Sequence, residues 1–142
     1  MRALLDVNVL LALFDPGHLF HSRARSWWRN NRDGGWASCP LTENGYLRIV
    51  SQKSYPGSIR LADARIQLQA WAVPPRHAFW PDDISLLDAT RFDYGRLLGP
   101  KQITDVYLLA LAVKNGGCLV TLDRGLSVTS VTDAKGESLV TI

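Results

Sequence analysis

Short apolar runs recur along the chain and predict five β-strands. They cover residues 2–6, 35–38, 76–80, 117–122 and 138–142. The interiors of the first and fourth runs are largely apolar, which is typical of strands that are covered on both faces. The pattern therefore predicts a sheet whose central strands lie between two layers of other structure.

Between these strands, apolar residues recur at the spacing of one helix face. In residues 19–32 the face consists of Phe20, Ala24, Trp27 and Trp28, and in residues 58–73 of Ile59, Ala62, Ile66 and Val73. Both segments are therefore predicted to be amphipathic helices with this face toward the core. Ser58 stands at the start of the second segment and is expected to cap it.

Two further helices follow from their end signals. One is expected from Pro40 to about Val50, because proline suits the first helical position. The other is expected over residues 104–115, with Thr104 as its cap and Gly116-Gly117 at its end. The interior of this last helix is apolar throughout, so the helix should be well buried.

The alternation of strands and helices favours a parallel sheet with helices on both faces. We therefore expect an α/β fold, a three-layer α/β/α sandwich with a parallel sheet of about five strands. At 142 residues the chain has the size of one domain, which we expect to span residues 1–142. In such sheets, ligands bind outside the carboxyl ends of the strands.

Four acidic residues are expected at this edge of the sheet. Asp6 ends the first strand and Asp123 follows the fourth, while Glu43 and Asp105 lie in the first turns of helices that follow strand ends. Four carboxylates at one edge repel one another unless a positive charge lies among them. A hard divalent cation with oxygen ligands, Mg²⁺ or Mn²⁺, is the natural partner.

Each acid taken alone also has a structural explanation. A negative charge in the first turn of a helix is favourable, which would suffice for Asp105. Asp123-Arg124-Gly125 is typical of a turn, and Asp6 could be a buried, hydrogen-bonded side chain. The four together favour a site, because these explanations do not account for their common position.

The composition places limits on the class of protein. Apolar residues make up 46% of the chain, which is enough for a sizeable core. The two cysteines, Cys39 and Cys118, are too few for a disulfide scaffold and fit a reducing cytosol. No run approaches the roughly 20 apolar residues of a membrane span, so we expect a cytoplasmic protein without membrane contact.

The net charge of +3 is a weak indication of an anionic partner. Arg25, Arg29 and Arg32 form a basic stripe at helical spacing. The stripe is either an ordinary solvated face or a contact for RNA phosphates or an acidic protein.

Other polar residues have structural interpretations. His18 and His21 are expected to be a surface pair at a helix start, since no further histidine or cysteine completes a zinc site. His77 is expected to serve in packing. Asp82-Asp83 is expected to cap a helical run over residues 84–88.

Four stretches of the chain resemble a known family. They are LLDVNVLLALF, PLTENGYLRIVS, WPDDISLLD and ITDVYLLALAVKNGGCLVTLDRGL. They resemble PIN-domain ribonucleases, specifically the VapC-type toxins of bacterial toxin–antitoxin pairs, over nearly the whole chain. The acids that fall on the family's metal-binding positions are Asp6, Glu43, Asp105 and Asp123. Asn8, Thr104 and Thr121 match supporting polar positions.

The resemblance implies Mg²⁺-dependent hydrolysis of RNA phosphodiesters, with Mn²⁺ as a substitute. Asp6, Asp105 and Asp123 would be metal ligands, and Glu43 would ligate the metal or orient water. The resemblance further implies a cognate antitoxin protein as partner and a homodimer.

Two alternatives come from other classes. A receiver-like signalling domain would need paired acids after the first strand and a late lysine, whereas Asp6 stands alone and Lys135 lies in a turn-like segment. A phosphatase with an aspartyl nucleophile would need a second aspartate where the chain has Asn8. A non-catalytic nucleic-acid-binding PIN relative would be favoured by a missing acid, and none of the four is missing.

Overall fold

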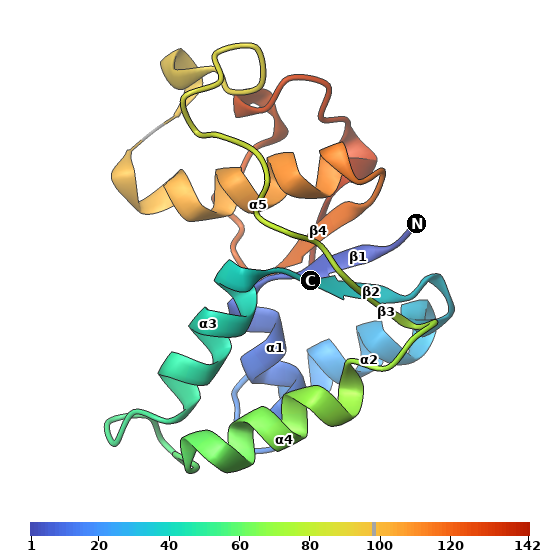
Figure 1. Cartoon of the computed structure of the whole chain (residues 1–142), viewed down its shortest axis with the longest axis vertical. Helices are drawn as coiled ribbons and strands as arrows, with labels where there is room; N and C mark the ends of the chain where they lie inside the picture. The colour runs from blue at the N-terminus through green and yellow to red at the C-terminus, as the bar shows by residue number, and fades with distance from the viewer. Residues whose placement is uncertain (98) are drawn as a thin grey trace.

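The computed structural model describes residues 1–97 and 99–142, and it contains a five-stranded sheet (Figure 1). The strands are β1 (Ala3–Leu5), β2 (Trp36–Ser38), β3 (His77–Phe79), β4 (Cys118–Thr121) and β5 (Leu139–Thr141). Their order is β3-β2-β1-β4-β5, and every neighbouring pair is parallel. The predicted parallel α/β sheet is confirmed, and each strand lies within its predicted range.

Helices cover both faces of this sheet. They are α1 (Val7–Phe14), α2 (His21–Asn31), α3 (Pro40–Val50), α4 (Leu61–Trp71) and α5 (Ile103–Lys114). Figure 1 shows the first four on one side of the sheet and α5 on the other. Short 3₁₀ turns occupy Arg32–Gly34, Tyr94–Arg96, Pro100–Gln102, Val128–Ser130 and Gly136–Ser138. In the described part of the chain, no helix is long and apolar enough to cross a membrane.

The central strand β1 supplies side chains to both cores. Ala3 and Leu5 belong to the core shared with α1 to α4, whereas Leu4 belongs to the core beneath α5. Its neighbour β4 alternates in the same way, because Val120 faces the first core and Leu119 the second. Period-two alternation between two apolar layers explains why β1, and β4 up to Thr121, consist of apolar residues.

Helix α1 was not predicted by the apolar spacing. Its residues from Val9 to Leu13 are all buried, so no polar face marks the helical period. The signal that the pattern did contain is Asp6, whose Oδ1 accepts a hydrogen bond of 2.7 Å from the Val7 amide and so caps the helix.

The predicted core face of the helix in residues 58–73 is wrong at Ala62, Ile66 and Val73, which are exposed, whereas Ile59 packs against the core. Ile66 and Val73 are 56% and 55% exposed, while Ala64 and Leu68 are buried. Trp71 also belongs to the inner side, with its ring centroid 4.9 Å from that of Phe14. Both sides of α4 carry apolar residues at helical spacing, so tertiary packing rather than periodicity decided which side was buried.

Two predicted helix caps are also wrong. Helix α4 begins at Leu61 with Arg60 in the capping position, so Ser58 lies outside it. Helix α5 begins at Ile103 with Gln102 in the capping position, and Thr104 is an exposed residue of its first turn. A 3₁₀ turn over Pro100–Gln102 leads directly into α5, and the capping position lies two residues earlier than predicted.

The predicted helical run over residues 84–88 is absent from the structure, and the acids before it bind elsewhere. The Asp82 carboxylate accepts a hydrogen bond of 3.1 Å from the Leu41 amide in the first turn of α3. Asp83 forms an ion pair with Lys114 at the end of α5. These partners lie far from Asp82 and Asp83 in the sequence, so a capping signal that is read from neighbouring residues cannot predict them.

The packing of α3 on α1 generates a testable prediction. A Cβ atom at buried Gly45 would lie 2.5 Å from Cγ2 of Val7, a short and stiff side chain. Gly45→Ala should therefore destabilise the protein by about 1–3 kcal/mol, although alanine favours helix formation. The free energy of unfolding in urea measures this change.

Two comparisons check the cause. Val7→Ala should relieve much of the Gly45→Ala penalty, which appears as a favourable coupling in a double-mutant cycle. Gly136→Ala adds a methyl group where no atom lies within 4 Å and should leave stability nearly unchanged. A Gly45→Ala protein as stable as wild type would contradict the close helix contact.

Candidate functional site

The sheet order defines where a ligand site belongs. The central strand β1 pairs with β2 on one side and β4 on the other, so the chain order reverses between β1 and β4. Ligands of open parallel sheets bind outside the carboxyl ends of the strands at such a switch point. Asp6 directly follows β1, and Asp123 lies two residues beyond the end of β4.

Asp6 is held rigidly at this point. Its side chain is only 5% exposed, with Oδ1 bonded to the Val7 amide and Oδ2 accepting a hydrogen bond of 2.7 Å from the Thr121 hydroxyl. Burial raises the pKa of Asp6 above its ordinary value, although these hydrogen bonds act in the opposite direction. The carboxylate therefore sits where its negative charge is poorly solvated.

The Thr121 hydroxyl links two other groups to Asp6. It accepts hydrogen bonds from Asn8 Nδ2 at 3.2 Å and from the Asp123 amide at 3.0 Å. Asn8 Oδ1 in turn accepts a hydrogen bond of 3.1 Å from the Leu122 amide. Threonine and asparagine thus tie the start of α1 to the end of β4 and place Asp123 beside Asp6.

Asp105 approaches the same point from the other face of the sheet. It lies in the first turn of α5, is half-buried, and has its pKa raised to about 6. The cause is burial first, then the charges of Asp6 and Asp123. The Asp123 charge also raises the pKa of Asp6. The structure therefore brings these three carboxylates into mutual repulsion.

Glu43 stands at the same edge but has its own surroundings. It lies in the first turn of α3, and its Oε1 accepts a hydrogen bond of 2.6 Å from Ser38 at the end of β2. The Ser38 oxygen also lies 2.8 Å from His77 Nε2 on β3. The sequence analysis missed Ser38, although a serine that ends a strand before an acidic helix start is a detectable signal.

His77 packs against Trp36, as expected, in addition to its contact with Ser38. Its ring centroid lies 4.4 Å from that of Trp36, with the two rings tilted by 55°. The contact with Ser38 depends on the pairing of β2 with β3, so the spacing of the residues along the chain does not reveal it.

The set of carboxylates at this edge is chemically suited to a hard divalent cation. All the donor atoms are oxygens, and burial together with the charges of neighbouring carboxylates raises the pKa of Asp6 and of Asp105. Within residues 1–97 and 99–142, no three Asp, Glu, His or Cys side chains form a group that could hold a metal ion as they stand. A bound cation would therefore need to draw the carboxylates closer together.

The remaining candidates stay apart from this group. Thr104 is exposed on α5 and forms no side-chain hydrogen bond with the acids in the described part of the chain. Arg25 and Arg29 are exposed on α2, and Arg32 is exposed in the 3₁₀ turn that follows. His21 Nδ1 lies 2.7 Å from a backbone carbonyl of α1, so this histidine is engaged in holding α2.

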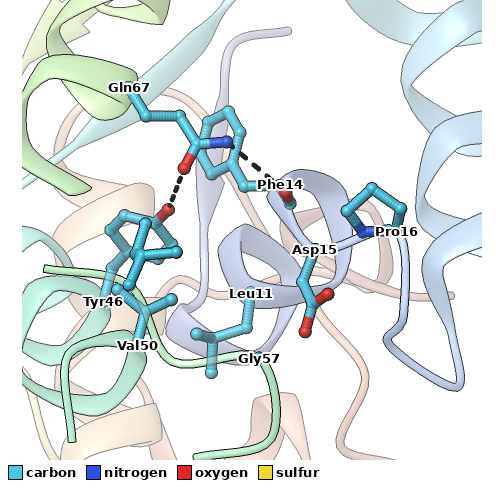
Figure 2. Close-up of a pocket in the computed structure, with 9 residues that line it drawn as sticks. Leu11, Phe14, Asp15, Pro16, Tyr46, Val50, Gly57 and Gln67 are labelled. Carbon is cyan, nitrogen blue, oxygen red and sulfur yellow. Dashed lines mark hydrogen bonds between the residues drawn. The ribbon is translucent and has the colours of Figure 1, made fainter. Parts of the chain in front are cut away.

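A separate cavity of about 130 Å³ lies between α1, α3 and α4 (Figure 2). Gln67 bridges this cavity: it accepts a hydrogen bond of 2.9 Å from the Tyr46 hydroxyl and donates one of 3.4 Å to the Phe14 carbonyl. Its one acid, Asp15, already accepts hydrogen bonds from Tyr55 and Gly17. None of the four predicted site acids lines this cavity, so it is separate from the acidic edge.

The fold and the acidic edge define a class of protein, a parallel α/β domain with carboxylates gathered at its switch point. The sequence profile of the PIN domain matches residues 3–131. The chain therefore belongs to the PIN-domain family, and the predicted resemblance to the VapC type is confirmed by the relatives that follow.

Three relatives come from Mycobacterium tuberculosis. Ribonuclease VapC44 is 50% identical over 143 aligned residues, which cover 100% of both chains. Ribonuclease VapC38 is 45% identical over 125 residues, covering 87% of this chain and 86% of the relative. Ribonuclease VapC39 is 43% identical over 128 residues, covering 89% and 92%.

The sheet order also argues against a receiver-like domain. Receiver sheets have the order 2-1-3-4-5, in which the first strand lies between the second and the third. Here β1 lies between β2 and β4. The sheet therefore does not have the strand order of a receiver domain.

The repulsion at Asp105 predicts a pH-dependent stability. Its folded-state pKa of about 6 exceeds the ordinary value of 3.8, so the folded protein binds the proton more tightly than the unfolded chain. Metal-free protein should therefore lose stability as the pH rises through this range. Asp105→Asn should be more stable than wild type above pH 6 by about 1–2 kcal/mol, after screening and the lost helix-dipole interaction, and this gain should vanish near pH 4.

Urea unfolding in EDTA across this pH range measures the effect. Asp63 is the matched control, because it is also a first-turn aspartate but its pKa is lowered by a hydrogen bond from Arg60 and by the Arg60 charge. Asp63→Asn should bring no gain in stability at any pH. An Asp105→Asn protein less stable than wild type throughout would show that Asp105 is only a helix-start acid.

Proposed function

We propose that this protein is a metal-dependent endoribonuclease that acts as the toxin of a toxin–antitoxin pair. The mutual repulsion of Asp6, Asp105 and Asp123 at the sheet's switch point carries the proposal. Identity over the full chain to a protein named Ribonuclease VapC44 supports RNA as the substrate. The chemistry is hydrolysis of a phosphodiester bond.

In this proposal Asp6, Asp105 and Asp123 hold Mg²⁺, or Mn²⁺ in its place. When bound, the cation would lower the pKa of a water molecule that it ligates and would neutralise charge on the attacked phosphate. Asp6 presents its charge in a fixed direction, because both of its oxygens are already hydrogen-bonded. Asp105 contributes a carboxylate that forms no ion pair with any residue that the structure describes, and it ionises fully only above its raised pKa.

The other polar residues have supporting roles. Thr121 and Asn8 hold Asp6 and Asp123 beside each other through their shared hydrogen bonds. Glu43 holds and orients the attacking water from the β2 side of the edge. Thr104 directly precedes Asp105 in the first turn of α5 and is proposed to help fix the geometry of the carboxylates.

The partners follow from the same family resemblance. We propose a cognate antitoxin protein that blocks the acidic edge, a homodimer, and a cytoplasmic location. The exposed arginines of α2 and the turn after it offer a surface for RNA phosphates or for an acidic antitoxin segment. A non-catalytic nucleic-acid-binding role is less well supported, since all four acids are present.

Cleavage of RNA by the purified protein tests the proposal. Wild type should cut RNA with Mg²⁺ or Mn²⁺, leave 5′-phosphate ends and stop in EDTA. Asp6→Asn, Glu43→Gln, Asp105→Asn and Asp123→Asn should each reduce cleavage to background. Gel analysis of end-labelled RNA, with the 5′ ends identified by sequencing, measures both outcomes.

Asp83→Asn is the control, because Asp83 is an exposed acid that is paired with Lys114 and stands outside the site. It should keep most of the activity. Full cleavage in EDTA with 2′,3′-cyclic phosphate ends would instead indicate a histidine mechanism and contradict the proposal.

A further inference from the structure

A short chain of hydrogen bonds connects His77 through Ser38 to Glu43. Ser38 is 1% exposed, and its hydroxyl oxygen lies 2.6 Å from Glu43 Oε1 and 2.8 Å from His77 Nε2. A buried hydroxyl with two polar partners at these distances is engaged with both. The three residues come from β2, α3 and β3, so the sheet pairing assembles them.

The donor and acceptor roles in this chain are determined by chemistry. An ionised carboxylate only accepts, so Ser38 gives its single proton to Glu43. The Ser38 oxygen then has only lone pairs to offer His77, and Nε2 must carry a proton and donate it. The direction is therefore from His77 to Ser38 and from Ser38 to Glu43.

The surroundings hold His77 in place for this role. Its ring lies against Trp36, the residue that pairs with it across β2 and β3. Burial and the nearby charge of Arg2 lower the pKa of His77, which favours a neutral ring that keeps one proton. Arg2 itself is fixed by hydrogen bonds to the carbonyls of Trp36, Pro75 and Arg76.

A Ser–His–acid set also invites comparison with a nucleophilic triad. In a triad the acid orients the histidine, and the histidine removes the proton of an accessible serine. Here the acid binds the serine instead, and Ser38 is almost wholly buried. The geometry fits a device that orients Glu43 and does not fit serine nucleophilic catalysis.

We propose that His77 and Ser38 are positioning residues that orient the Glu43 carboxylate for phosphodiester hydrolysis. This inference rests on the proposed nuclease function. These two hydrogen bonds, from His77 to Ser38 and from Ser38 to Glu43, form a relay that occupies Glu43 Oε1. Among the described residues Oε2 has no hydrogen-bond partner, so it is available to bind the attacking water. Hydrogen bonds of this supporting kind typically change activity by about 10–100-fold.

Nuclear magnetic resonance on metal-free protein tests the relay without activity. Long-range ¹H–¹⁵N spectra should show His77 with its proton on Nε2 in the wild type. In Glu43→Ala the Ser38 proton is released to bond His77, so the Nδ1–H tautomer of His77 should increase. A His77 that serves only in packing against Trp36 would keep the same tautomer in both proteins, which would overturn the relay.

Kinetics with matched variants tests its role in the reaction. His77→Phe keeps the ring but removes the donor, whereas His77→Gln keeps an N–H near the Nε2 position. We expect His77→Phe and Ser38→Ala to lower kcat by about 10–100-fold with little change in KM, and His77→Gln to restore most of it.

The possible failures are distinguishable. If wild type cleaves RNA and Glu43→Gln does not, full activity in both His77→Phe and Ser38→Ala overturns the positioning role alone. Equal losses in His77→Phe and His77→Gln likewise overturn it, because they point to lost packing. If wild type cleaves no RNA with Mg²⁺, the proposed function fails and the catalytic role of the relay fails with it, whatever the spectra show.

Discussion

The hydrogen bond between the Asp6 carboxylate and the Thr121 hydroxyl is the contact on which the acidic edge depends. It joins the end of the central strand β1 to the end of β4, across the point where the chain order reverses. The same carboxylate caps α1, and the same hydroxyl holds Asn8 and the Asp123 amide. One buried interaction therefore sets the start of a helix, the register of two strand ends and the position of a second acid.

This arrangement places negative charge where the fold alone would not favour it. Asp105 gains from the dipole at the start of α5 but is opposed by burial and by two neighbouring carboxylates, and its pKa of about 6 shows that opposition prevails. Uncompensated charge of this kind is typical of functional sites rather than of structural acids. In the proposed nuclease, a bound cation would relieve the repulsion.

The two halves of the edge differ in how they hold their acids. Asp6 and Asp123 are tied through Thr121 and a network of amides, whereas Glu43 is held through Ser38 and His77 on the other side of β1. Both halves use a hydroxyl at the end of a strand that donates a hydrogen bond to a carboxylate at the same edge of the sheet. The parallel sheet supplies this repeated geometry, because all its strands end at the same edge.

The sequence by itself determined the strands, the parallel α/β class and the position of the four acids, since these follow from local apolar runs and from the rule that parallel strands end together. It did not determine α1, in which every residue from Val9 to Leu13 is buried, or the inner face of α4, which has apolar residues on both sides. The partners of Asp82, Asp83 and His77 were likewise decided by the tertiary structure. Each is brought into contact from a distant segment, and the spacing of residues along a chain contains no information about such contacts until the elements have packed.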